Sequence, residues 1–214
     1  GHIRTADSAA RGLIDAAEEF GAGLSVVGAG SNGLFKRFTV GSVANALLHA
    51  AGVPVALAPR GYSRMEPLTR ITCAVGERRG AEDVLEVACD AAARRGLPLR
   101  LLSLLALDSP GDAAVEEAQL HIADRVRRAE ALTEGKSTIT GVVAQGRTIE
   151  NAVDDLEFDD GEILIIGSSR LARTNQLFLG ATASKVLRSL PVPMVVVPRN
   201  YTPAPQHQTS GDPQ

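Results

Sequence analysis

The chain has 214 residues, which allows one large or two small domains, and its apolar residues (44%) are mostly small aliphatics, because aromatic residues make up only 3%. The formal net charge of -3, with acids and bases interspersed, excludes the strongly basic surface typical of proteins that bind nucleic acid or anionic membranes. No apolar run reaches the roughly 20 residues that span a bilayer, so we expect a soluble, cytoplasmic protein built of α/β layers.

The chain opens with elements that make up only part of a domain. Residues 1–62 are predicted to form a helix, a strand, a second helix and a second strand. LSVVG (24–28) predicts the first strand, and the small residues after Gly41 predict the start of the second helix. VPVALAPRGY (53–62) contains the second strand. We interpret this segment as the C-terminal part of a first domain, which we call the first repeat.

A complete set of alternating strands and helices follows, which we call the second repeat (70–201). Strands are expected in 70–75, 97–107, 137–144, 162–167 and 193–198, and helices in 81–95, 109–135, 148–158 and 182–190. Strands that alternate with helices of this length pair in parallel through right-handed crossovers. The fold class predicted for this repeat is a doubly wound α/β domain with a parallel five-stranded sheet.

The two segments are copies of one another at an offset of 139 residues. Gly167 aligns with Gly28 and Gly180 with Gly41, while VPMVVVPRNY (192–201) aligns with VPVALAPRGY (53–62). The expected organisation is a partial first domain, a linker, a complete second domain and a Pro-rich disordered tail, with bounds at 1–62, 63–69, 70–201 and 202–214.

The repeat also predicts which strand edges need partners. The first repeat contains no counterpart of the strand at 70–75, so its strand at 24–28 is expected to lack a neighbour and to expose apolar side chains. This leads us to expect roughly 70 further residues of the parent protein upstream of Gly1. The last strands of the two repeats, within 53–62 and 192–201, both follow a Val-Pro pair, and we call them the V-P strands. They are expected to pair, within the chain or in a homo-oligomer, because an unpaired apolar edge promotes aggregation.

A glycine-bounded loop follows the strand at 162–167 and leads into a helix. In an open parallel sheet, ligands lie beyond the carboxyl ends of the strands, and a helix N-terminus there favours an anion. Glycines allow a close approach of phosphate and positive φ angles. The candidate nucleotide-binding residues of the two copies are Gly28, Gly30, Ser31, Gly41, Ser42, Gly167, Ser168, Arg170, Gly180 and Ala181.

These residues resemble the motif of the universal stress protein family: Gly, two residues, Gly, nine residues, then Gly and Ser or Thr, after an apolar fourth strand. The resemblance covers 7–62 as a partial copy and 70–201 as a complete one. It implies a fold of the universal stress protein and adenine nucleotide α-hydrolase type, with tandem repeats joined as a pseudo-dimer through their fifth strands. It also implies a role in the stress response, with ATP and Mg²⁺ as the bound cofactors.

The match to the family motif is incomplete. Arg170 replaces the inner glycine of the second copy, and Ala181 replaces its final Ser or Thr. The first copy keeps Ser42 but has Ser31 at the inner position, beside Gly30. Gly76 stands where the family places an Asp that contacts the nucleoside. We therefore expect a degenerate second site, in which Arg170 either binds phosphate or fills its space.

Other kinds of site have less support in the sequence. The acidic stretch 154–162 lacks the glycine and glutamate spacing of a calcium loop, and no metal-ligand pattern occurs. Cys73 and Cys89 are interpreted as buried thiols. No nucleophile or acid–base motif indicates an enzyme. Two functions stay open: non-catalytic ATP binding or sensing, and a nucleotide-independent dimerisation or protein-interaction module.

Overall fold

The helices and strands follow the predicted order. The computed structural model describes residues 2–28, 40–59, 62, 67–76, 81–106, 112–169, 172 and 176–202. The first repeat contains α1 (Ala9–Glu19), β1 (Ser25–Gly28), α2 (Ser42–Ala50) and β2 (Val55–Ala58). The second repeat contains β3 (Arg70–Ala74), α3 (Ala81–Arg95), β4 (Leu99–Ala106), α4 (Asp112–Thr133), β5 (Ile139–Gly146), α5 (Ile149–Asp154), β6 (Glu162–Gly167), α6 (Ala181–Ser189) and β7 (Met194–Val197).

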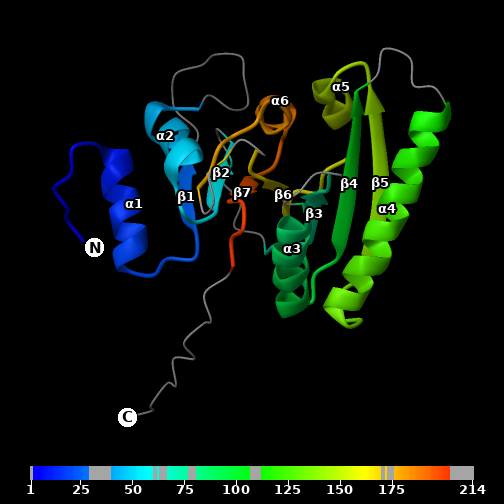
Figure 1. The fold of residues 1–214 in the computed structure, drawn as a ribbon, viewed down its shortest axis with the longest axis horizontal. Helices are drawn as coiled ribbons and strands as arrows, with labels where there is room; N and C mark the ends of the chain where they lie inside the picture. Colours follow the sequence, from blue (N-terminus) through cyan, green and yellow to red (C-terminus); the bar gives the residue numbers. More distant parts are fainter. Residues whose placement is uncertain are drawn as a thin grey trace, which may run out of the picture.

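All strands belong to one continuous sheet, in the order β1-β2-β7-β6-β3-β4-β5 (Figure 1). Within the second repeat, every pairing from β5 to β7 is parallel, which confirms the predicted doubly wound sheet. The sheet extends beyond this repeat because β2 pairs antiparallel with β7, and β1 pairs parallel with β2. The expected pairing of the two V-P strands is thus observed within the chain.

The pairing between β2 and β7 is symmetric with respect to the repeat. Ala56 lies opposite Val195, and these two positions are related by the offset of 139 residues. We call the β2–β7 pairing the seam between the repeats. Across it, Val55 lies opposite Val196 and Leu57 lies opposite Met194, so each residue faces the counterpart of the other. An approximate two-fold axis therefore passes between Ala56 and Val195.

Two tyrosines at corresponding positions reach across this axis in opposite directions. The Tyr201 hydroxyl donates to the carbonyl of Gly23 in the first repeat at 3.2 Å. The Tyr62 hydroxyl donates to the carbonyl of Asp160 in the second repeat at 3.4 Å. The symmetry of the sequence is thus repeated in contacts outside the sheet.

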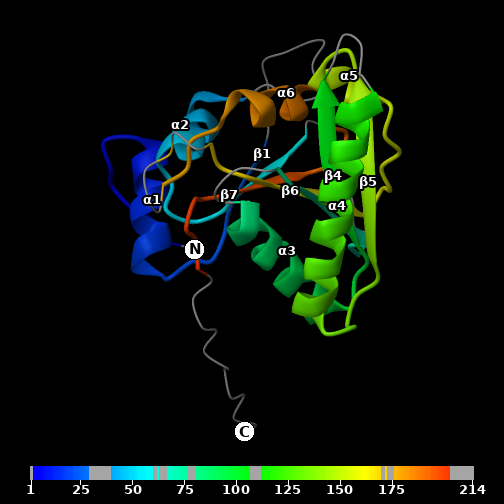
Figure 2. The same cartoon turned by 45° about the vertical axis from the view of Figure 1, so that its right-hand side comes forward.

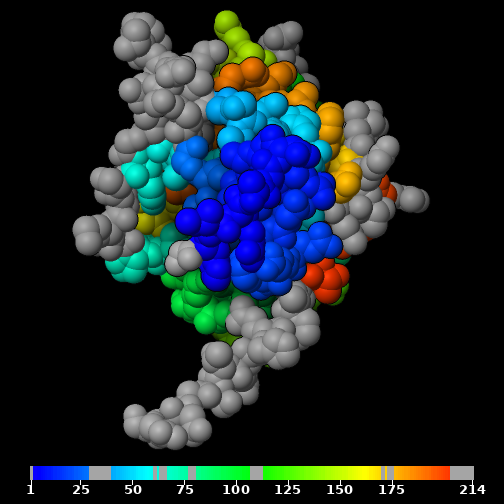
Figure 3. All heavy atoms as spheres, turned by 90° about the vertical axis from the view of Figure 1, so that its left-hand side faces the viewer, coloured from blue at the N-terminus to red at the C-terminus, as the bar shows by residue number. Residues whose placement is uncertain are grey.

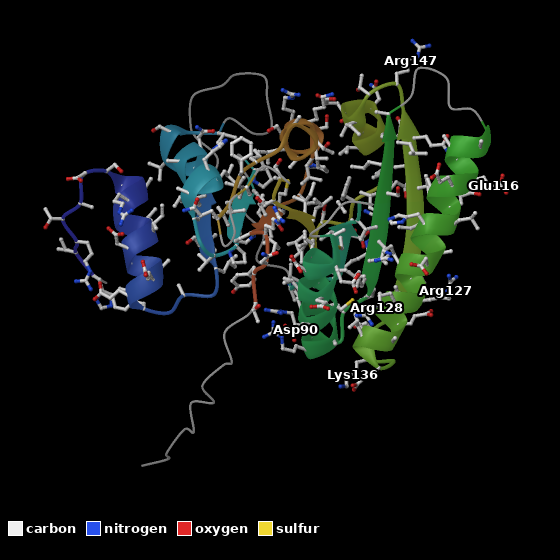
Figure 4. All side chains as sticks on the ribbon, viewed as in Figure 1. Asp90, Glu116, Arg127, Arg128, Lys136 and Arg147 are labelled. Carbon is white, nitrogen blue, oxygen red and sulfur yellow. The ribbon has the colours of Figure 1, made fainter. Side chains whose placement is uncertain are left out.

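Helices cover the two faces of the sheet and enclose two apolar clusters (Figure 2). One cluster joins α2, α5 and α6 to the sheet and spans both repeats, with Leu47, Leu187 and Val196 among its buried members. The other packs α3 and α4 against the sheet. Glu116 and Arg127 lie on the outer side of α4 (Figure 4).

The short α5 corrects the prediction of a helix over 148–158. The Thr148 side chain caps the helix by accepting from the Asn151 N–H, but the helix ends at Asp154. Beyond it, the Glu157 carbonyl accepts from Arg100 Nη1 at 3.0 Å, and the Arg100 guanidinium lies 5.1 Å from the centre of the Phe158 ring. These tertiary contacts hold the acidic segment in a non-helical path.

The edge strand β1 exposes apolar side chains, as the repeat predicts. It pairs with β2 alone among the described residues, and Val26 and Leu24 are 68% and 45% exposed. Figure 3 shows α1 spread over this end of the molecule, with α2 and α6 beside it. Among the described residues, no helix is both long and apolar enough to cross a membrane. Residues 63–66 of the proposed linker and 203–214 of the proposed tail lie outside the described residues.

Candidate nucleotide-binding site

The second repeat places its candidate loop where the direction of the strand order reverses. From β3 the chain continues to β4 and β5 on one side of the sheet, whereas β6 and β7 lie on the other side. The carboxyl ends of β3 and β6 are therefore adjacent, with Ala74 paired to Ile166. Ligands of open α/β sheets bind outside such a switch point. Gly167 is the last residue of β6, and Gly76 lies two residues beyond the end of β3.

Gly167 is a glycine because the first part of α3 crosses the end of β6. A Cβ atom added at Gly167 would lie 2.7 Å from Cγ2 of Val84. Gly180 has a similar reason, because its Cβ would lie 3.0 Å from the Cβ of Ser169. Neither residue has a positive φ angle, and the same holds for Gly28 and Gly41. None of these four glycines therefore uses the positive φ angles that glycine permits, and a close approach of neighbouring atoms explains the two in the second repeat.

Ser168 and Ser169 tie the start of the loop to its end. The Phe178 N–H donates to Ser168 Oγ at 2.8 Å, and the Ser169 N–H donates to the Phe178 carbonyl at 2.8 Å. The Ser168 N–H in turn donates to the Val197 carbonyl on β7 at 2.8 Å. Ser168 therefore has a structural role, because its hydroxyl bonds the loop backbone, and its role as a direct ligand stays a prediction.

The loop ends at the N-terminus of α6, which no side chain caps. Gly180 is the N-cap residue of α6, with φ -74° and ψ 169°, and no side chain caps the helix. Ala181, the first helical residue, is exposed. In the first repeat, Gly41 is the N-cap of α2 in the same way, without a side-chain cap, and Ser42 is the first helical residue. Uncapped first-turn N–H groups and the helix dipole attract anions.

The structure brings four of the predicted residues together and leaves others undescribed. Gly167, Ser168, Gly180 and Ala181 surround the ends of the loop after β6. In the first repeat, Gly28 ends β1, and Gly41 and Ser42 begin α2. The remaining candidates lie outside the described residues, namely Gly30, Ser31 and Arg170.

Gly76 has space around it for a side chain. It is exposed, its φ angle lies outside the left-handed region, and a Cβ added there would meet no atom of the described residues within 4 Å. The glycine is thus not required by the backbone or by packing. Its effect on the site is the lack of a carboxylate at the end of β3.

One contact at the loop has no counterpart in the sequence analysis. The N–H groups of Leu177 and Leu179 donate to the carbonyls of Ala51 and Leu48 at 2.9 and 3.0 Å. Leu48 lies in the last turn of α2 and Ala51 is the C-cap residue of this helix, so both acceptors belong to the first repeat. Backbone-to-backbone bonds of this kind leave no residue-type signal, so the sequence could not indicate them.

The two thiols of the second repeat are buried. Burial raises the pKa of the Cys73 thiol on β3 far above its ordinary value. Burial, followed by the negative charge of Glu82, raises the pKa of Cys89 to about 12. In the described part of the chain, no cluster of three His, Cys, Asp or Glu side chains could hold a metal ion.

The comparisons with known proteins agree with this geometry. Residues 2–59 and 67–198 match the model of the universal stress protein family in two segments. The chain belongs to this family. Universal stress proteins of Mycobacterium bovis and Mycobacterium tuberculosis are 32% identical to it over 209 residues, covering 92% of this chain and 71% of each relative.

Solved structures of universal stress proteins share the fold. One from Archaeoglobus fulgidus has a TM-score of 0.61 at 23% identity over 89% of this chain. A putative universal stress protein from Pseudomonas aeruginosa has a TM-score of 0.59 at 21% identity over 90% of this chain. The chain spans 65% of the length of the first structure and 69% of the second.

Proposed function

We propose that this universal stress protein binds an adenine nucleotide, ATP with Mg²⁺, without catalysing its hydrolysis, as part of a stress response. The observation that carries the proposal is the loop after β6, which lies at the switch point of the sheet and ends at the uncapped N-terminus of α6. Phosphates would lie against the first-turn N–H groups of this helix. The nucleoside would lie towards the end of β3.

The second site is proposed to be weak. A carboxylate at the end of β3 would accept a hydrogen bond from the nucleoside, but Gly76 has no side chain to do so. The lack of one such bond costs about 1–3 kcal/mol of affinity, or roughly 5- to 150-fold. Arg170 stands at the inner glycine position of the motif and would contribute charge to phosphate binding or fill that space. The first-repeat loop, which retains Ser42, is proposed as the better-preserved copy.

Calorimetric titration with ATP and Mg²⁺ tests the proposal. We expect saturable binding that is weaker than micromolar, and displacement of ATP by ADP. No detectable heat or displacement into the millimolar range would contradict nucleotide binding by this chain. It would favour the alternative function described below.

A glutamate at the start of either helix distinguishes the two loops. Ala181→Glu and Ser42→Glu each place a negative charge at an exposed first helical position. Such a charge favours the helix through its dipole but repels phosphate. We expect the variant at the binding loop to lose ATP affinity at unchanged or slightly raised thermal stability, while the other variant retains it. Retained affinity in both variants would contradict binding at these helix ends.

A second candidate function rests on the seam between the repeats. The antiparallel pairing of β2 with β7 buries Val55 and Val196 completely and joins the two repeats without any nucleotide. The alternative is therefore a nucleotide-independent dimerisation or protein-interaction module. In either case, we propose a cytoplasmic protein whose repeats form a pseudo-dimer, with domain bounds at 1–62 and 70–201.

A further inference from the structure

The returning arm of the second-repeat loop, residues 176–180, lies between two sets of backbone contacts. On one side, Phe178 exchanges hydrogen bonds with Ser168 and Ser169 at the start of the loop. On the other side, the N–H groups of Leu177 and Leu179 donate to carbonyls of α2. Alternate residues thus bond in opposite directions, as in a strand between two neighbours.

The contact with α2 satisfies groups that the helix itself leaves unpaired. The last carbonyls of a helix have no N–H donors within the helix, so they need donors from elsewhere in the chain. The Ala51 and Leu48 carbonyls find these donors in the returning arm. Leu177 is 1% exposed and lies in the apolar cluster with Leu47 and Leu48 of α2. The arm is therefore bonded and packed to the first repeat as well as to its own repeat.

Aromatic side chains make the same connection at the surface. The Phe178 ring meets the His49 ring of α2 edge to face, with 5.0 Å between ring centres. Phe178 is 36% exposed and His49 is exposed, so either side chain can be removed with little loss of core packing. This pair is accessible to a test that leaves the buried leucines in place.

The arm leads directly into the proposed phosphate site. Leu179 is followed by Gly180, the N-cap of α6, whose first-turn N–H groups would bind phosphate. We propose that α2 of the first repeat positions this arm, so that phosphate affinity at α6 of the second repeat depends on contacts from the first. Because the proposal rests on the proposed nucleotide function, its test includes a measurement without nucleotide.

The first measurement is amide hydrogen exchange in the nucleotide-free chain. Removing the edge-to-face contact with Phe178→Ala or His49→Ala is expected to raise exchange at the Leu177 and Leu179 amides about two- to tenfold. Phe178→Tyr keeps the ring contact and is expected to keep the protection. The matched control is Phe20→Ala, which removes a comparable ring contact with His2, 4.6 Å between centres, away from the loop. Unchanged exchange at both amides in Phe178→Ala would overturn the proposal.

The second measurement compares ATP with adenosine. Phe178→Ala is expected to weaken ATP binding about two- to tenfold and to leave adenosine affinity unchanged, because the arm positions the phosphate site alone. Equal loss for both ligands, or no loss despite faster exchange, would overturn the positioning role. If the wild-type chain bound neither ligand, the proposed function would be wrong, and the dependence of phosphate affinity on α2 with it. Hydrogen exchange would still decide whether α2 holds the arm.

Discussion

At the scale of single residues, position 76 allows the ligand chemistry of the proposed site to be changed without disturbing the fold. Among the described residues, no atom lies within 4 Å of a Cβ added at this position. Gly76→Asp is therefore expected to leave stability nearly unchanged and to strengthen ATP binding by roughly 5- to 100-fold, through one additional charge-assisted hydrogen bond to the nucleoside. Calorimetry with ATP and adenosine measures the gain.

The matched control for this variant is Gly76→Asn, which has the same shape without the charge. We expect it to recover part of the affinity, because an amide oxygen is a weaker acceptor than a carboxylate. An unchanged or lower affinity of Gly76→Asp would contradict the placement of the nucleoside beside β3.

The two thiols give a prediction about pH. Because burial raises the pKa of Cys73 and Cys89, both remain protonated in the folded chain at pH 9, and iodoacetamide should label them only after unfolding. Unfolding lets them ionise near pH 8.5, so their contribution to the free energy of unfolding is full below that pH and falls as the pH rises through the range up to about 12. Fast labelling of the native chain would contradict their burial.

At the scale of elements, a buried charged network fixes the amino ends of three strands. Glu162 on β6 is fully buried and accepts from Arg70 on β3 and Arg100 on β4, each at 2.7 Å, and from the Thr72 hydroxyl. Burial lowers the pKa of Arg100, whereas the charge of Glu162 opposes this change. The network lies at the amino ends of these strands, whereas the proposed site lies beyond the carboxyl ends of β3 and β6. We therefore assign the network a role in fixing the register of the strands.

Glu162→Gln is expected to destabilise the chain by about 3–5 kcal/mol, because it leaves two guanidinium groups without their buried counter-charge. Chemical denaturation measures the loss. Asp90→Asn is the matched control, since it breaks the exposed Asp90–Arg94 pair of α3, 2.7 Å apart, which is worth at most about 1 kcal/mol (Figure 4). Equal effects of the two variants would show that the network contributes no more than a surface pair.

The elements were predictable because their apolar runs and glycine boundaries are local signals. The predicted bounds of α3 and β6 coincide with the observed ones. The end of α5 was missed because Arg100 and the Glu157 carbonyl meet only in the folded chain. The glycines predict the position of the candidate loop, and the close neighbours that require Gly167 and Gly180 become visible only in the folded chain. The contact with α2 could not be predicted, because it is made by backbone groups that are the same for every residue type.

At the scale of the whole molecule, the cluster around α2, α5 and α6 contains buried residues of both repeats, so we expect the repeats to unfold as one cooperative unit. Leu57 on β2 is 1% exposed in this cluster. Leu57→Ala is expected to cost about 2–5 kcal/mol and to raise the exchange of the slowest amides in β4 and β6 as much as in β2. Leu120→Ala, at a position 68% exposed on α4, is the control. Faster exchange confined to β1 and β2 would mean that the repeats unfold separately.

The approximate two-fold axis between Ala56 and Val195 makes the seam self-complementary. Two strands that meet through corresponding residues form the same contacts whether they belong to one chain or to two. The covalent connection between the repeats then acts by raising the effective concentration of one strand near the other. The same seam therefore permits exchange between molecules at high protein concentration, with β2 of one chain exchanging its partner for β7 of another.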